Sequence, residues 1–256
     1  MKMTSFKGMT AIVTGSAKNI GKAIAAGFAK QGANIVVCDR LTAKAEETAK
    51  EIEQKYGVET MVIACDVRER EKVNKGVEAA IGRFGKIDIL VNNAGGSAWL
   101  LDKITTFAEA EPETLDFVID VNIKGTMNFT QAVLKSMIPN KFGRIINISS
   151  IAGVCGIIGR VDYSAAKGAQ ISMAKALAME VGKYNICVNC VSPGAIARDG
   201  LGPGKNSGFL GEDGRGGVPE DVADAVVSLA AQDYVTGVNL IVDGGRTLGP
   251  FAQYWV

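Results

Sequence analysis

Histidine is absent from the sequence, and it also lacks basic clusters and long apolar runs. The Lys+Arg count of 28 nearly equals the Asp+Glu count of 27, so we expect no nucleic-acid partner. No stretch reaches the ~18 consecutive apolar residues that a membrane span needs, and residues 1–9 lack the basic and apolar regions of a signal peptide. We therefore expect a cytoplasmic protein that does not bind membranes.

Cysteine is sparse as well, and the 5 cysteines are too few and too scattered for a disulfide framework. The one close pair, Cys187 and Cys190, would suit a redox or metal role if both thiols faced the same way. The pair lies in the apolar run 186–191, which is typical of a strand, where residues three apart point to opposite faces. Without a histidine to complete a ligand set, we expect two buried apolar side chains and no metal site.

The rest of the chain alternates short strand-like apolar runs with helix-like stretches, which is the βαβ rhythm of a parallel sheet. A length of 256 residues suits one large α/β domain. We predict a single-domain, Rossmann-like, doubly wound sheet of seven parallel strands flanked by helices, spanning residues 1–256. The expected strands are 10–13, 35–37, 60–64, 87–91, 144–148, 186–191 and 239–242. The expected helices are 20–30, 43–55, 73–81, 112–138 (stopped by Pro139), 162–181 and 219–231.

A glycine-rich loop, at about 195–217, interrupts this pattern. Each glycine costs a helix about 1 kcal/mol relative to alanine, so the segment cannot hold a stable helix. It follows the strand 186–191 at the edge where doubly wound sheets bind ligands. The position favours a mobile lid over a small-molecule site, and a surface insertion without function is the alternative.

A glycine turn joins the first strand to the first helix and contains Gly15, Asn19, Ile20 and Gly21. Glycines in such a turn let the backbone approach a pyrophosphate, which the N-terminus of the next helix attracts. On its own, the turn is also compatible with an ordinary α/β connection.

Asp39 ends the second strand about 20 residues past this turn, where a carboxylate accepts hydrogen bonds from the adenosine ribose of a dinucleotide. The same carboxylate repels a 2′-phosphate, so it favours NAD over NADP. Lys18 and Arg40 lie where a cation could pair with that phosphate, and NADP therefore remains possible; solvated surface charges are the alternative.

Further motifs follow in order along the chain: Asn92-Asn93-Ala94-Gly95, Ser150, Tyr163-Ser164-Ala165-Ala166-Lys167, Pro193-Gly194, residues 219–223 and Val242-Asp243-Gly244-Gly245. With the glycine turn, they make the chain resemble the classical short-chain dehydrogenase/reductase family over practically its whole length. The resemblance implies an NAD(P)-dependent oxidoreductase that interconverts a secondary alcohol and a ketone.

The resemblance implies a catalytic group made of Asn122, Ser150, Tyr163 and Lys167. Tyr163 and Lys167 are four apart and share one helix face. A nearby ammonium lowers a tyrosine pKa that is normally about 10, so we expect Tyr163 to exchange a proton with a substrate oxygen near neutral pH. Ser150 would hydrogen-bond the same oxygen. By the family pattern, Asn122 bends its helix and holds a water that connects Lys167 to solvent.

The resemblance also implies the remaining cofactor contacts. Asp66 and Val67 would contact the adenine, the segment Asn93, Ala94 and Gly95 would line the adenine-ribose side, and Tyr163, Lys167, Pro193, Gly194 and Ile196 would lie toward the nicotinamide.

Two positions depart from the family pattern. Asn19 replaces a glycine, and asparagine tolerates a positive φ better than other side chains. Arg198 replaces a threonine that helps to hold the carboxamide. An arginine at that position faces either a substrate carboxylate or phosphate, or the solvent.

The substrate is less constrained by the sequence. A group of apolar residues favours a hydrophobic body such as a hydroxysteroid or bile acid: Trp99, Leu100, Leu101 and Phe209. A sugar or polyol and a 3-oxoacyl thioester are the alternatives, and a non-catalytic dinucleotide sensor is the rival of another class. The helix 162–181 is rich in small residues, so a second helix could pack closely on it, and the resemblance implies a homotetramer.

Overall fold

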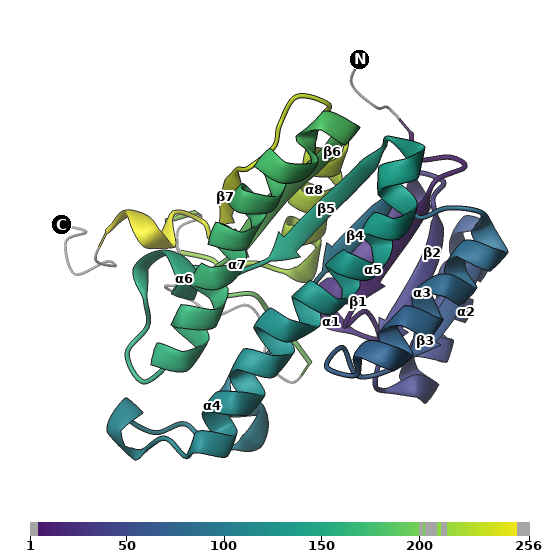
Figure 1. The fold of residues 1–256 in the computed structure, drawn as a ribbon. Coiled ribbons are helices and arrows are strands. Elements are labelled where there is room, and N and C mark those ends of the chain that lie inside the picture. Colours follow the sequence, from purple (N-terminus) through teal and green to yellow (C-terminus); the bar gives the residue numbers. More distant parts are fainter. Residues whose placement is uncertain (1–4, 200–201, 203–208, 211–213, 250–256) are drawn as a thin grey trace.

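The computed structural model describes residues 5–199, 202, 209–210 and 214–249, and it forms a seven-stranded sheet between two layers of helices (Figure 1). All neighbouring strands are parallel, in the order β3-β2-β1-β4-β5-β6-β7. The predicted fold class is confirmed. The strands are β1 (Thr10–Thr14), β2 (Asn34–Asp39), β3 (Thr60–Ala64), β4 (Ile89–Asn92), β5 (Gly143–Ile148), β6 (Ile186–Pro193) and β7 (Asn239–Val242).

The strand order reverses at β1, whose two neighbours are β2 and β4. From β1 the chain builds the sheet outward to β3, and then returns to build the other half from β4 to β7. Connections on either side of the reversal diverge, which opens a crevice at the carboxyl ends of β1 and β4. Ligands of doubly wound sheets bind in such a crevice.

Two apolar clusters join the sheet to its helix layers. One face is covered by α1 (Asn19–Lys30), α2 (Thr42–Tyr56) and α8 (Pro219–Ala230), and the other by α3 (Arg70–Phe84), α5 (Gly125–Asn140) and α7 (Val161–Val181).

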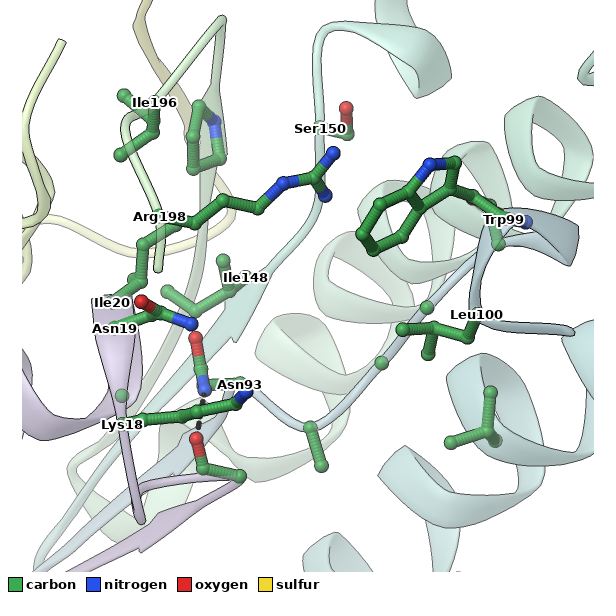
Figure 2. A pocket seen from close by; sticks show the side chains of 18 of the residues that line it. Lys18, Asn19, Ile20, Asn93, Trp99, Leu100, Ile148, Ser150, Ile196 and Arg198 are labelled. Carbon is green, nitrogen blue, oxygen red and sulfur yellow. Dashed lines mark hydrogen bonds between the residues drawn. The ribbon is translucent and has the colours of Figure 1, made fainter. Parts of the chain in front are cut away.

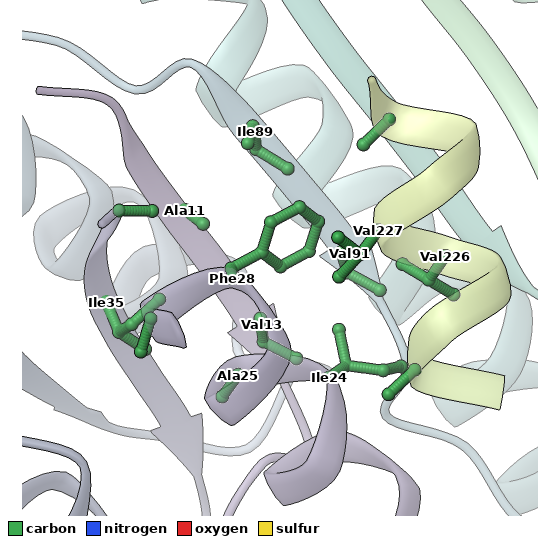
Figure 3. Packing of buried hydrophobic residues seen from close by; sticks show 14 of the residues in the cluster. Ala11, Val13, Ile24, Ala25, Phe28, Ile35, Ile89, Val91, Val226 and Val227 are labelled. Atoms are coloured by element: carbon green, nitrogen blue, oxygen red, sulfur yellow. The ribbon is translucent and has the colours of Figure 1, made fainter. Parts of the chain in front are cut away.

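Phe28 of α1 lies at the centre of the first cluster, between the strand residues Ile89 and Val91 and the α8 residues Val226 and Val227 (Figure 3). Successive strand residues alternate between the clusters because side chains point to opposite faces.

The predicted helix 112–138 differs from the observed one. It divides into α4 (Pro112–Ile119), a π-helical turn at Asp120–Lys124, and α5. Pro139 lies inside α5, which ends one residue later, with Lys141 in the left-handed region at φ 50°. Proline has no N–H to donate within the helix, but in the last turn this costs only one hydrogen bond. The helix therefore continues to Asn140 instead of stopping before Pro139.

Two further predictions concern β6 and the loop after it. Cys187 donates to the Asp233 carbonyl and Cys190 to that of Gln170, so the thiols point to different faces, as a strand requires. Much of the predicted lid lies outside the described residues, at 200–201, 203–208 and 211–213. The described ends of the loop pair with each other at Ile196 and Gly217.

No helix within the described part of the chain combines the length and the apolar character that a bilayer span requires.

Candidate active site

A cleft of about 500 Å³ lies at the carboxyl ends of the strands, on the reversal of strand order. Ser150 lines this cleft, and so does every residue expected to contact the cofactor. These residues are Gly15, Asn19, Ile20, Gly21, Asp39, Arg40, Asp66, Val67, Asn93, Ala94, Gly95, Tyr163, Lys167, Pro193, Gly194 and Ile196. Asn122 is fully buried behind this lining. In Figure 2, the glycine turn lies on one side of the cleft and Trp99 and Leu100 on the other.

The glycine turn leaves no room for side chains where the backbone faces the cleft. A Cβ on Gly21 would lie 2.2 Å from the Gly15 carbonyl oxygen, and Gly15 itself has φ +63°. Asn19 has φ 51°, so the asparagine adopts the left-handed conformation that the sequence analysis expected of it. The Asn93 side-chain amide donates to the carbonyls of Thr14 and Gly15 and holds the turn in place.

Asp39 is held in a fixed orientation at the end of β2. One carboxylate oxygen accepts from the Ala17 N–H and the other from the Leu41 N–H, both at 3.0 Å. The Lys18 Nζ lies 3.6 Å from the Asp199 Oδ2, so the Lys18 ammonium already forms an ion pair. Asp66 is paired with Arg68, and the hydrogen bond from that guanidinium lowers the pKa of Asp66.

The backbone cradle and the oriented carboxylate fit a nicotinamide dinucleotide. The tight approach at Gly15 and Gly21 exposes backbone to a pyrophosphate. Asp39 would accept from the adenosine ribose, at the far end of the same cleft from Tyr163 and Ser150.

Lys167 is a buried lysine in the first turns of α7. Its Nζ donates to the Ile148 carbonyl at 2.8 Å and to the Gln170 Oε1 at 2.9 Å. Burial lowers the pKa of Lys167 to about 7, because the interior disfavours the ammonium. The Nζ lies 5.7 Å from the centre of the Tyr163 ring.

The net pKa shift of Tyr163 is opposite to the expected one. Burial raises the pKa of Tyr163 above its ordinary value, and this effect outweighs a hydrogen bond with Ser150 and the charges of Arg160 and Arg198, which all lower it. Desolvation dominates because the phenol is buried, and Lys167 is desolvated too, so its ammonium is a weakened partner.

Asn122 lies in the π-helical turn and is tied to the segment beside Lys167. Its side-chain amide donates to the carbonyls of Gly96 and Val118, and its Oδ1 accepts from the Gly96 N–H. The widened turn agrees with the expected distortion of this helix.

Gln170 is a site residue that sequence reasoning missed. Its amide nitrogen donates to the Asn122 carbonyl at 3.0 Å and to the Thr126 hydroxyl at 2.8 Å, while its oxygen accepts from Lys167. A protein amide thus links Asn122 to Lys167. A polar residue three positions after Lys167, in an otherwise apolar stretch, was the available signal.

Arg160 and Arg198 both reach the end of the cleft that contains Trp99 and Tyr163. The Arg198 guanidinium stacks on Trp99, 3.9 Å from the ring centre, while the residue as a whole stays exposed to solvent. Figure 2 shows the side chain extending across the cleft toward Trp99. Arg160, also missed from the sequence, donates to the Ser97 hydroxyl at 2.9 Å. Trp99 and Leu100 line the cleft, and the other two apolar candidates, Leu101 and Phe209, do not.

Known proteins resemble this chain in sequence and in fold. The family model for short chain dehydrogenases matches residues 9–203. The chain is 40% identical to (2S)-[(R)-hydroxy(phenyl)methyl]succinyl-CoA dehydrogenase subunit BbsD of Thauera aromatica, over 93% of this chain and 96% of that protein. It is 36% identical to the 3-oxoacyl-[acyl-carrier-protein] reductase FabG of Aquifex aeolicus, over 93% and 97%.

A solved structure of a 7α-hydroxysteroid dehydrogenase, complexed with NADH and 7-oxo glycochenodeoxycholic acid, superimposes with a TM-score of 0.83 at 32% identity. The match covers 94% of this chain and 95% of that one. The family model and the relatives extend over most of the chain and agree with the fold and the cleft. The chain therefore belongs to the short-chain dehydrogenase family of oxidoreductases.

Proposed function

We propose that the protein interconverts a secondary alcohol and a ketone with NAD(H), using Ser150, Tyr163 and Lys167. The observation that carries the proposal is the single cleft that joins the glycine turn and Asp39 to the Tyr163 and Ser150 hydroxyls. A turn that suits a dinucleotide pyrophosphate, in one cleft with an acid–base group, supports redox chemistry at a carbinol carbon.

Each side chain has a separate task in this mechanism. A bound nicotinamide would accept or supply the hydride. The Tyr163 hydroxyl transfers the proton to or from the substrate oxygen, and the Ser150 hydroxyl donates a hydrogen bond that orients that oxygen. Lys167 supplies positive charge near the phenol, and its two hydrogen bonds, to Ile148 and Gln170, keep the ammonium in position.

Asn122 acts through position in this proposal. It connects the segment at Gly96 with the chain of hydrogen bonds through Gln170 to Lys167. The proposed cofactor is NAD, because Asp39 is aimed by two backbone N–H groups and Lys18 is paired with Asp199. The hydroxysteroid dehydrogenase structure, which contains NADH, supports the same cofactor.

For the substrate we propose an alcohol with a hydrophobic body, which Trp99 and Leu100 would contact. The hydroxysteroid dehydrogenase supports this class. A 3-oxoacyl thioester is the second candidate, because the relative from Aquifex aeolicus is a 3-oxoacyl-[acyl-carrier-protein] reductase. The proposed assembly is a homotetramer.

The test follows NADH absorbance during incubation with a panel of secondary alcohols, polyols and 3-oxoacyl thioesters. We expect turnover of at least one hydrophobic alcohol. Tyr163→Phe should lower kcat at least 100-fold, within the range of about 10² to 10⁴ for a positioned acid–base group, and should retain NADH binding. Tyr234→Phe is the matched control, since Tyr234 is fully exposed. NADH binding without turnover of any compound would favour a dinucleotide sensor.

A further inference from the structure

The substrate end of the cleft carries two arginines with spare donor groups. Arg160 and Arg198 both line the cleft beside Trp99 and Tyr163. The Arg198 guanidinium lies against the Trp99 ring, and Arg160 precedes Tyr163 by three residues, so both belong to the same end of the cleft as the reacting hydroxyl. They come from different parts of the chain, the segment before α7 and the segment after β6, and converge only in the folded protein.

The carboxylates that line the cleft are committed elsewhere. Asp66 pairs with Arg68, Asp199 pairs with Lys18, and Asp39 accepts from two backbone N–H groups. Asp162, the acidic neighbour of Arg160, lines a separate small hollow with Lys103 and Phe107. Within the described lining, the substrate end therefore has positive charge without a matching carboxylate.

The contacts of the two guanidinium groups leave donors available. Trp99 covers one face of the Arg198 guanidinium and leaves its N–H edge unobstructed by that contact. Among the described residues, Arg198 makes no hydrogen bond or ion pair, and the one hydrogen bond from the Arg160 guanidinium is the donation to Ser97. Stacking fixes the plane of Arg198, so binding an anion there costs little additional side-chain entropy.

We propose that Arg160 and Arg198 bind a carboxylate of the substrate, and that the preferred substrates are hydroxy acids or oxo acids with this carboxylate near the reacting carbon. The inference rests on the proposed function and specifies its substrate class. A carboxylate matches the guanidinium fork through two parallel hydrogen bonds, and the Trp99 ring covers one face of the Arg198 guanidinium.

The first test measures kcat/KM for 3-hydroxy acids, with phenyl and alkyl bodies, against their own methyl esters. The ratio of acid to ester isolates the carboxylate, because any effect on Tyr163 changes both compounds equally. A hydrogen bond to a charged group is worth roughly 10- to 100-fold, so we expect the wild type to favour the acids by at least about 10-fold.

Arg198→Gln and Arg160→Gln should each bring that ratio toward one. Arg83→Gln is the matched control, because it removes the same charge from the exposed end of α3, near Glu59 and Phe84. The control should keep the wild-type ratio. A wild-type enzyme that favours the esters, or arginine variants that keep the acid preference, would overturn the proposal.

A second test does not depend on turnover. Phenylacetate and phenylacetamide are titrated into the NADH-loaded protein by calorimetry. We expect the wild type to bind the acid at least about 10-fold more tightly than the amide, and Arg198→Gln to bind both equally. Equal affinities in the wild type would contradict the carboxylate site. If no alcohol is turned over and the acid still binds selectively, the proposed reaction fails and the anion site stands.

Discussion

Lys167 shows how burial sets the chemistry of a single side chain. It is 3% exposed, and desolvation lowers its pKa from 10.5 to about 7. Two oxygen acceptors, from Ile148 and Gln170, satisfy the amino group without supplying a negative charge. Lys167 is therefore only partly protonated near neutral pH, and desolvation remains the largest effect on the pKa of Tyr163.

This shift makes stability depend on pH. Between about 7 and 10.5, the unfolded chain binds a proton on Lys167 that the folded chain does not, so the unfolding free energy from this group rises with pH across that window. The slope is about 1.4 kcal/mol per pH unit. Replacing Lys167 with Met removes the effect, so the Tm of Lys167→Met relative to wild type should fall steadily from pH 7 to 10.

Thermal unfolding at several pH values checks this prediction. Lys175→Met serves as the control, because Lys175 is an exposed residue on the same helix. A difference between Lys167→Met and wild type that stays constant with pH would contradict the assigned shift.

Gln170 offers a second prediction at this scale, because its amide joins Lys167 to Asn122 and Thr126. Gln170→Leu removes three hydrogen bonds, but Lys167 keeps its bond to Ile148 and Thr126 keeps its bond to the Asn122 carbonyl, so each loss costs about 0.5–1.5 kcal/mol. Gln170→Glu keeps the size and adds a negative charge that favours the ammonium.

If Gln170 positions Lys167 for the reaction, the two variants should have different pH–rate profiles. The rate of alcohol oxidation should rise with pH as Tyr163 ionises. A retained ammonium stabilises the tyrosinate, so this rise should occur at lower pH in Gln170→Glu than in Gln170→Leu. Gln54→Leu, at an exposed position of α2, should behave as wild type. Identical pH profiles for all variants would leave Gln170 with a structural role alone.

Asp39 determines cofactor choice in the proposed function. A 2′-phosphate beside its oriented carboxylate brings like charges together, and Lys18 is already paired with Asp199. We expect wild-type kcat/KM to be higher with NAD than with NADP, and Asp39→Ala to narrow the difference. Equal values for the two cofactors in the wild type would show that Lys18 and Arg40 outweigh the carboxylate.

The glycine turn shows how backbone conformation, at the scale of one connection, prepares a binding surface. Asn19 at φ 51° lets α1 begin directly beside the cleft, and its Oδ1 accepts from the Asp199 N–H. The left-handed conformation costs an ordinary side chain about 1–2 kcal/mol, and a β-branched residue is among the least suited to it.

We therefore expect Asn19→Gly to keep NADH affinity within a few-fold and Asn19→Val to lose at least about 10-fold, corresponding to about 1.4 kcal/mol. Fluorescence titration with NADH measures both. Asn140→Val, at the end of α5 and away from the cleft, is the control. Equal affinities for the Gly and Val variants would show that strain in the turn does not limit binding.

The π-helical turn is the other element with a local consequence. It lies between α4 and α5 and includes Asn122, whose side chain bonds Gly96 on a different segment. In the wider turn, the Asn122 carbonyl accepts hydrogen bonds from two side chains, the Gln170 amide and the Thr126 hydroxyl, in addition to the backbone pattern of the helix.

At the scale of the whole molecule, β7 and α7 are among the elements that leave apolar side chains exposed. The edge strand β7 exposes Leu240 and Ile241, and α7 exposes Met179 among small residues. An apolar edge strand that the described residues leave exposed favours association with another subunit. We expect light scattering to give the mass of four subunits for the wild type and a smaller mass for Ile241→Lys. A stable wild-type monomer at micromolar concentration would contradict the predicted tetramer.

Local patterns in the sequence were sufficient for the architecture and for many residues of the cleft. Strand and helix periods depend on neighbouring residues alone, so the order of residues along the chain was enough to locate the seven strands and the glycine turn. The periodicity predicted one continuous helix over 112–138 because a π-helical turn is still helical and carries no glycine or proline that would mark it in the sequence.

Tertiary structure alone decided the environment of each reactive group. The pKa of Tyr163 is governed by desolvation, which depends on what packs around the phenol and not on the residue four positions away. The contacts of Gln170 with Asn122, and of Arg198 with Trp99, join residues remote in the chain. Sequence therefore identified which groups could react, while burial and long-range contacts determined their charges and partners, because both arise only when distant segments pack together.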